Sequence, residues 1–135
     1  MSMFDAINTA NTGVDMSQTW MNAISNNLAN INDATRTSQK AYQAEFPVVT
    51  ALGGGQNGTG SGVAVIGVAH GSAAGITVYD PSSPLADAKG MVREPNVDLA
   101  QQMTDLIMAQ RTYQANVNAI STAEQTYQDG LGLKP

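Results

Sequence analysis

The residues that could carry chemistry are few and lie far apart in this chain of 135 residues. His70 is the single histidine and there is no cysteine, so a zinc site or a histidine-activated nucleophile would lack partners. Asp80 and Asp87 lack the spacing and the glycine of a calcium loop. We therefore expect a structural role for His70, and no catalytic residue, cofactor, metal ligand or small-molecule substrate.

A glycine-rich run, GGGQNGTGSG, spans residues 53–62. It lacks the Gly-Lys-Ser/Thr ending of a phosphate-binding loop and does not open a helix. We interpret it as the flexible tip of a β-hairpin. The glycosylation sequon at residues 57–59 is a pattern that is common by chance.

The formal net charge is −5, yet residues 1–33 hold no Lys or Arg and no basic cluster occurs elsewhere. This argues against nucleic acid and anionic membranes as partners. No run approaches the ~20 apolar residues of a membrane span, so we expect no direct membrane insertion. The first residues lack the basic and apolar regions of a cleaved signal peptide.

Apolar residues recur every seven positions near each end of the chain, which is typical of one stripe along a helix. The first stripe predicts a helix over residues 3–31 and contains Ile7, Val14, Met21 and Leu28, with the companions Met3, Ala10, Ile24 and Ile31 around a polar Ser17. The second predicts a helix from about residue 97 to 129 and contains Leu99, Leu106, Tyr113, Ile120 and Tyr127, with Met103, Val117 and Leu131. We expect these residues to pack the helices together as an antiparallel coiled-coil hairpin and to serve assembly.

Capping signals flank both predicted helices. Ser2 followed by Asp5 matches a capping box at the first helix. Asn96 is the expected N-cap of the second helix, with Asp98 in its first turn. Glycines from residue 130 onward are expected to end that helix.

The middle of the chain predicts a small β-rich insert. Residues 45–50 contain Pro47, which restricts this strand to an edge or a bulge, and residues 63–68 and 76–79 supply two further strands. Residues 85–93 are expected to be a connector. The fold class is therefore mainly α, with a β-hairpin or three-stranded insert at the tip far from both termini. Its domains are the paired helices, residues 1–33 and 97–135, and the insert with its connectors, residues 34–96.

The faces outside the stripes are polar but carry few charges, since the chain has 11 Asn and 10 Gln against 17 charged residues. Hydrogen-bonded amides can be buried at modest cost, whereas lone charges cannot. These faces either pack among identical neighbours or are simply solvated. Phe4 and Trp20 lie off the stripe and either form a second contact face or lie under the insert. Gln110 and Glu124 either fix the register of the helices or lie at the solvent-exposed edge of the helix pair.

Residues 25–32, SNNLANIN, resemble the N-terminal signature of the bacterial flagellar rod and hook proteins, which are axial proteins. Residues 84–90, 95–98 and 111–117 (PLADAKG, PNVD and RTYQANV) resemble the proximal-rod members of that family in order and spacing. The signature positions are Asn26, Asn27, Leu28, Ala29, Asn30, Pro95, Asn96, Val97, Asp98, Tyr113, Ala115 and Asn116. Residues 34–42 depart from the Thr-Pro-Gly-Tyr-Lys of many relatives, and Met91 stands where relatives usually carry Tyr.

The resemblance implies a non-enzymatic structural subunit of the proximal rod of the flagellar basal body, the drive shaft that crosses the periplasm. It implies other copies of the chain and other rod proteins as partners in a helical assembly. It also implies export by the flagellar type III apparatus without cleavage, and terminal helices that become ordered only on assembly. The alternative is a secreted helical-hairpin adaptor or effector that binds a partner through the same stripes. That alternative explains the helices but not the Asn-rich signature or the β insert.

Overall fold

Two long helices precede and follow two small antiparallel sheets along the chain in the computed structural model, which describes residues 3–53 and 60–132. The elements, in chain order, are α1 (Met3–Ala29), β1 (Glu45–Ala51), β2 (Val63–His70), β3 (Ile76–Tyr79), β4 (Met91–Glu94) and α2 (Leu99–Gly132). The expected mainly α fold with small β-hairpins between terminal helices is thus confirmed. Residues 1–2, 54–59 and 133–135, which include Ser2 and the sequon, lie outside the described residues.

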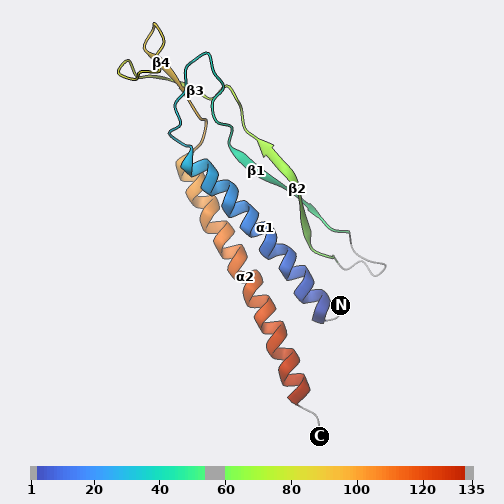
Figure 1. The fold of residues 1–135 in the computed structure, drawn as a ribbon. Coiled ribbons are helices and arrows are strands. Elements are labelled where there is room, and N and C mark those ends of the chain that lie inside the picture. The colour runs from blue at the N-terminus through green and yellow to red at the C-terminus, as the bar shows by residue number, and fades with distance from the viewer. Residues whose placement is uncertain (1–2, 54–59, 133–135) are drawn as a thin grey trace.

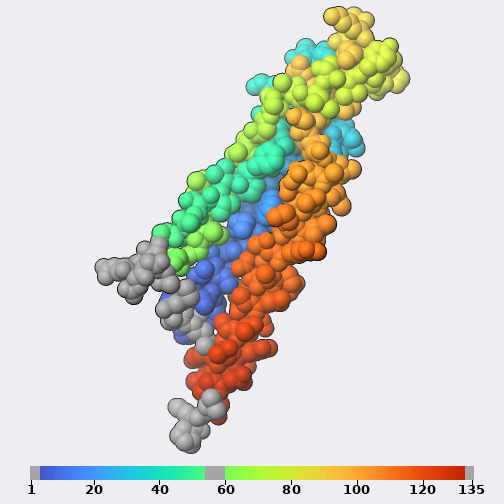
Figure 2. All heavy atoms as spheres, turned by 180° about the vertical axis from the view of Figure 1, so that it is seen from behind, coloured from blue at the N-terminus to red at the C-terminus, as the bar shows by residue number. Residues whose placement is uncertain are grey.

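The two helices run antiparallel and lie side by side (Figures 1 and 2). Both chain ends lie toward one end of the molecule and the β3–β4 hairpin lies at the other (Figure 1). α1 has 27 residues and α2 has 34, so α2 continues past the start of α1. The rings of Phe4 and Tyr127 meet edge to face there, with centroids 6.0 Å apart.

The start and the end of α2 differ from the sequence prediction. Asp98, and not Asn96, is the N-cap, because its Oδ1 accepts a hydrogen bond from the backbone N–H of Gln101 at 3.0 Å. The helix also continues through Gly130 to Gly132. Gly130 does not end it, because a glycine disfavours a helix by only about 1 kcal/mol and breaks no backbone hydrogen bond.

The insert contains two separate two-stranded sheets, β1–β2 and β3–β4, so the expected three-stranded sheet is wrong. The strand β4 overlaps the end of the segment predicted to be a connector, residues 85–93, and extends to Glu94. Its four residues, two of them charged, are too short to display a hydrophobic period. Pro47 does lie in an edge strand, as expected, since each sheet has only two strands. The pairing of β1 with β2 shifts between Val48 and Val49 and leaves Ile66 as a bulge.

The β1–β2 hairpin lies along α1 and does not cap the far tip (Figures 1 and 2). Thr12 of α1 binds the start of β2. Its hydroxyl donates to Thr9 O at 2.7 Å and accepts a hydrogen bond from the N–H of Val63 at 3.1 Å. Gly62 has a φ of 108° and approaches the Thr12 side chain so closely that a Cβ would clash with it. The hairpin therefore covers one side of α1, and α2 packs against another.

The apolar core is small. The buried hydrophobic residues among those described are Ala10, Ala23, Ile24, Ala41, Ala44, Val92 and Ala109. Five of these seven are alanines, and an alanine removes far less apolar surface from water than a leucine or phenylalanine does. Helix pairing in this chain therefore depends on close backbone approach and on polar contacts more than on large apolar side chains.

Candidate assembly interface

A buried amide joins three elements at the far end of the helix pair. Asn27 is 1% exposed, and its Nδ2 donates to Gln102 Oε1 at 2.9 Å and to the Glu45 carbonyl at 3.0 Å. Its Oδ1 accepts from the Glu45 N–H at 2.7 Å and from the Tyr42 hydroxyl at 3.1 Å. An asparagine amide has two N–H donors and two acceptor lone pairs, so every one of them is used. We call Asn27, Tyr42, Glu45 and Gln102 the Asn27 cluster.

Neighbouring groups stabilise the hydrogen bonds of the Asn27 cluster. Burial and the nearby Glu45 carboxylate raise the pKa of Tyr42 above its ordinary value, so its hydroxyl stays a donor at neutral pH. Asn26 donates to Glu45 Oε2 at 3.0 Å. Asn30 donates to the carbonyl of Asn26 at 2.8 Å and satisfies a backbone group at the end of α1. The three asparagines therefore fix how the chain leaves α1 and enters β1.

Small residues line the closest approach of the two helices. Ser17 is fully buried and donates to the Gly13 carbonyl at 2.7 Å. A Cβ on Gly13 would lie 2.6 Å from the Asn116 amide of α2, so only glycine fits there without a shift. Ala109 is also fully buried. The seam between α1 and α2 thus follows Ala10, Gly13, Ser17, Ile24 and Asn27 on one helix and Gln102, Ala109 and Asn116 on the other.

The apolar residues predicted to pack the helices flank this seam. Of that set Ile24 and Ala10 are buried, at 2% and 8% exposure. Nine others are half-buried: Ile7, Val14, Met21, Leu28, Ile31, Leu106, Tyr113, Val117 and Ile120. Four are exposed: Leu99, Met103, Tyr127 and Leu131. These side chains therefore offer apolar surface beyond what the helix pair covers, and their role in packing between subunits stays a prediction.

The signature residues gather mainly at one end of the helix pair. Residues 26–30 end α1 and residues 95–98 lead into α2. Pro95 is buried and Asp98 is the N-cap, whereas Asn96 is exposed. The remaining three, Tyr113, Ala115 and Asn116, lie near the middle of α2, where only Asn116 faces the seam at Gly13. The cluster residues Tyr42, Glu45 and Gln102 were not identified from the sequence.

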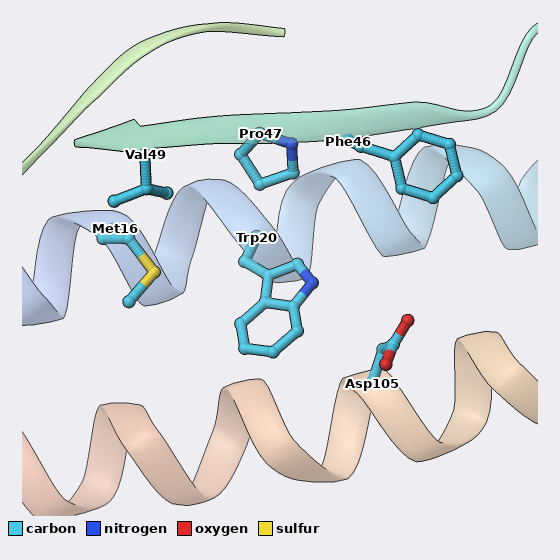
Figure 3. A pocket seen from close by; sticks show the side chains of 6 residues that line it. All are labelled: Met16, Trp20, Phe46, Pro47, Val49 and Asp105. Carbon is cyan, nitrogen blue, oxygen red and sulfur yellow. The ribbon is translucent and has the colours of Figure 1, made fainter. Parts of the chain in front are cut away.

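A groove of about 350 Å³ opens between α1, α2 and β1. Met16, Trp20, Phe46, Pro47, Val49 and Asp105 line it, and we call it the Trp20 groove (Figure 3). The Trp20 ring points from α1 toward α2, and the Asp105 side chain extends from α2 toward α1 (Figure 3). Trp20 therefore belongs to a partly open apolar surface that the β1–β2 hairpin covers on one side only.

Residues 3–53 and 60–132 show little sign of a metal site or a membrane span. No group of three or more His, Cys, Asp or Glu side chains in these ranges could hold a metal ion. Within the same ranges no helix combines the length and the hydropathy needed to cross a membrane. His70 is the exposed last residue of β2.

Comparison with known proteins identifies the family. A family model described as the C-terminal region of flagellar basal body rod FlgEFG proteins matches residues 88–133. The flagellar basal-body rod protein FlgC of Escherichia coli O6:H1 is 35% identical over 126 residues, which cover 92% of this chain and 92% of that protein. The chain belongs to the FlgC family of flagellar basal-body rod proteins. FlgC of Salmonella typhimurium is 32% identical over 92% of each chain, and FlgC of Borreliella burgdorferi is 28% identical over 98% of each.

Membership of the FlgC family gives the signature a structural meaning. The resemblance rested in part on residues 26–30 and 95–98, and the structure places these two stretches at the same end of the helix pair, beside the Asn27 cluster. The family model covers β4 and all of α2. The matches to the relatives span 92% and 98% of this chain, so they include most of the β insert.

Proposed function

We propose that this chain is a structural subunit of the proximal rod of the bacterial flagellar basal body. The observation that carries the proposal is the 35% identity to a FlgC protein over 92% of both chains. In this role the chain would form part of the drive shaft that crosses the periplasm and transmits motor torque. It would be exported by the flagellar type III apparatus without cleavage and would have no enzymatic activity.

The exposed apolar surface supports a role in assembly. Large hydrophobic side chains exposed on α2 include Leu99, Met103, Ile107, Met108, Tyr127 and Leu131. Contiguous exposed apolar surface on a small protein marks a contact site, and a core made mostly of alanines gives the isolated chain little hydrophobic stabilisation. Burial of these side chains against neighbours would supply stabilisation that the single chain lacks.

The exposed apolar residues of α2 also support different roles for the helices and the insert. We propose that residues 1–33 and 97–135 pair as an antiparallel coiled coil and form an inner layer of the rod, with residues 34–96 as an outer layer. Neighbours in the rod would be other copies of this chain and other rod proteins. A contact between two different faces, repeated by a rotation that does not close, generates a helical array and not a ring.

The proposal is tested by deletion, complementation and isolation of basal bodies. Cells that lack the chain are expected to be non-motile, and cells complemented with the tagged chain should recover motility and carry it in purified basal bodies. A tagged Gln125→Ala chain is a matched control, because Gln125 is exposed and polar. Motile deletion cells, or a chain found in the medium and not in basal bodies, would favour the secreted adaptor.

A further inference from the structure

The Trp20 groove combines an apolar lining with a single carboxylate. Five of its lining residues are apolar, and the sixth is Asp105 of α2. Gln101 donates to Asp105 Oδ1 at 2.9 Å, and no Lys or Arg of the described residues forms an ion pair with it. A carboxylate that becomes covered by apolar surface is destabilised unless a cation accompanies it. An occupant of the groove should therefore be apolar and carry one positive charge.

The outer face of α2 has that chemistry. Arg111 is exposed and is the only Lys or Arg in either helix. Ile107 and Met108 lie four and three positions before it, on the same helix surface, and are 49% and 53% exposed. Arg111 has no hydrogen-bond or ion-pair partner among the described residues. We call these three residues the Arg111 face.

We propose that the Trp20 groove of one copy receives the Arg111 face of a second copy, with the guanidinium of Arg111 pairing with the carboxylate of Asp105. This inference rests on the proposed function, because it assigns one subunit contact within the rod. The occupant is a second copy because both halves are present on the same chain and complement each other in charge and in apolar character. An arginine side chain can bind a carboxylate through two parallel hydrogen bonds, which also fixes orientation.

The placement of the two halves fits an assembly that continues beyond a dimer. Arg111 lies six positions after Asp105, which places the two residues about 120° apart around α2. A copy that receives a neighbour in its groove therefore keeps its own Arg111 face free for the next copy. Such a contact joins two different surfaces and propagates from copy to copy.

Cysteine cross-linking tests the contact directly, because the chain has no cysteine of its own. Within one copy the Cα atoms of residues 105 and 111 lie about 9 Å apart along the helix, beyond the reach of a disulfide. A chain carrying both Asp105→Cys and Arg111→Cys can therefore form this disulfide only between copies. Mild oxidation of basal bodies that contain it should give a ladder of species in steps of 14.1 kDa.

The matched control carries Asp105→Cys with Gln125→Cys. Gln125 is exposed on nearly the same side of α2 as Arg111 but lies about 21 Å further along the helix. The control pair and both single-cysteine chains should remain monomeric after oxidation. The proposed contact would be overturned by any of three results. The double-cysteine chain could stay monomeric, a single-cysteine chain could also form dimers, or the products could differ in mass by steps other than the mass of this chain.

Failure of this contact can be told apart from failure of the proposed function. If the double-cysteine chain is present in basal bodies but does not cross-link, only the contact is refuted. If the cysteine-free chain is itself absent from basal bodies, the proposed function is refuted. If the two cysteines prevent incorporation into basal bodies, reversing the charges of the two residues provides a second test. Asp105→Arg and Arg111→Asp should each reduce incorporation into basal bodies, and the two together should restore it. No restoration in the double variant would also overturn the contact.

Discussion

The side chains of Asn27 and Gln102, 75 residues apart in the chain, form a hydrogen bond of 2.9 Å in the interior of the helix pair. Both are almost completely buried. The same Asn27 amide also binds the backbone of Glu45 at the start of β1. One side chain therefore sets the register of α1 against α2 and the point at which the insert leaves the helices.

Replacing Asn27 with alanine should destabilise the chain by about 2–4 kcal/mol, because buried polar groups of Glu45 and Gln102 would lose their partner. Urea unfolding monitored by circular dichroism measures the change. Asn22→Ala is the matched control, since Asn22 is exposed on the same helix, and it should change stability by less than about 0.5 kcal/mol. Equal effects of the two substitutions would contradict the role of the Asn27 cluster.

Gly13 and Asn116 should behave as a coupled pair. Gly13→Ala alone is expected to destabilise the chain, because the new Cβ would meet the Asn116 amide. In an Asn116→Ala background the same change should stabilise by about 0.5–1 kcal/mol, since alanine favours a helix over glycine. A double-mutant cycle from urea unfolding provides the coupling energy. If Gly13→Ala has the same effect in both backgrounds, the helices do not approach each other there.

Aspartate substitutions should separate folding from assembly. Ile24→Asp would place a charge at a fully buried position and should unfold the helix pair as well as prevent rod assembly. Met103→Asp, at a 47% exposed position, should leave stability within about 0.5 kcal/mol but abolish motility. Leu106→Asp, half-buried, should also abolish motility. Motile cells carrying Met103→Asp or Leu106→Asp would show that these stripe residues do not serve assembly.

The loop between β3 and β4 should loosen in acid. Asp87 accepts hydrogen bonds from the backbone N–H groups of Met91 and Lys89 at 3.1 and 2.8 Å, and these bonds lower its pKa below the ordinary 3.8. A lowered carboxyl pKa contributes stability that is complete above the ordinary value and is lost as pH falls through the lowered one. The amide proton shifts of Met91 and Lys89 should therefore titrate with a midpoint below 3.8. A midpoint at or above 3.8, or the same titration in Asp87→Asn, would contradict this.

The helices were predictable from sequence because a seven-residue apolar period over four turns or more is a strong signal. Their seam was predictable only in part, because Ala10 and Ile24 belong to the predicted series, whereas Gly13 lies outside it and Ser17 interrupts it. Ser17 as the single polar member of its series was the available clue. Asn27 was identified through the family signature, but its partners Tyr42 and Gln102 come from a loop and another helix. Only tertiary structure brings them together.

The insert was predicted less well than the helices. β1, β2 and β3 have the β-branched content that marks a strand. β4 has four residues between Gly90 and Pro95, and its strand character comes from pairing with β3. The position of the β1–β2 hairpin along α1 depends on contacts between residues far apart in the chain, such as Gly62 against Thr12. No local pattern predicts that contact.

Amide hydrogen exchange of residues 3–29 and 99–132, in the free chain and in isolated basal bodies, tests the central claim most directly. A helix pair with a core mostly of alanine should exchange quickly when free and become protected once neighbours bury its exposed apolar residues. Fast exchange in the free chain with strong protection in the basal body is the result that we predict. Strong protection in the free chain, unchanged in the basal body, would mean a self-sufficient helix pair and would contradict stabilisation by assembly.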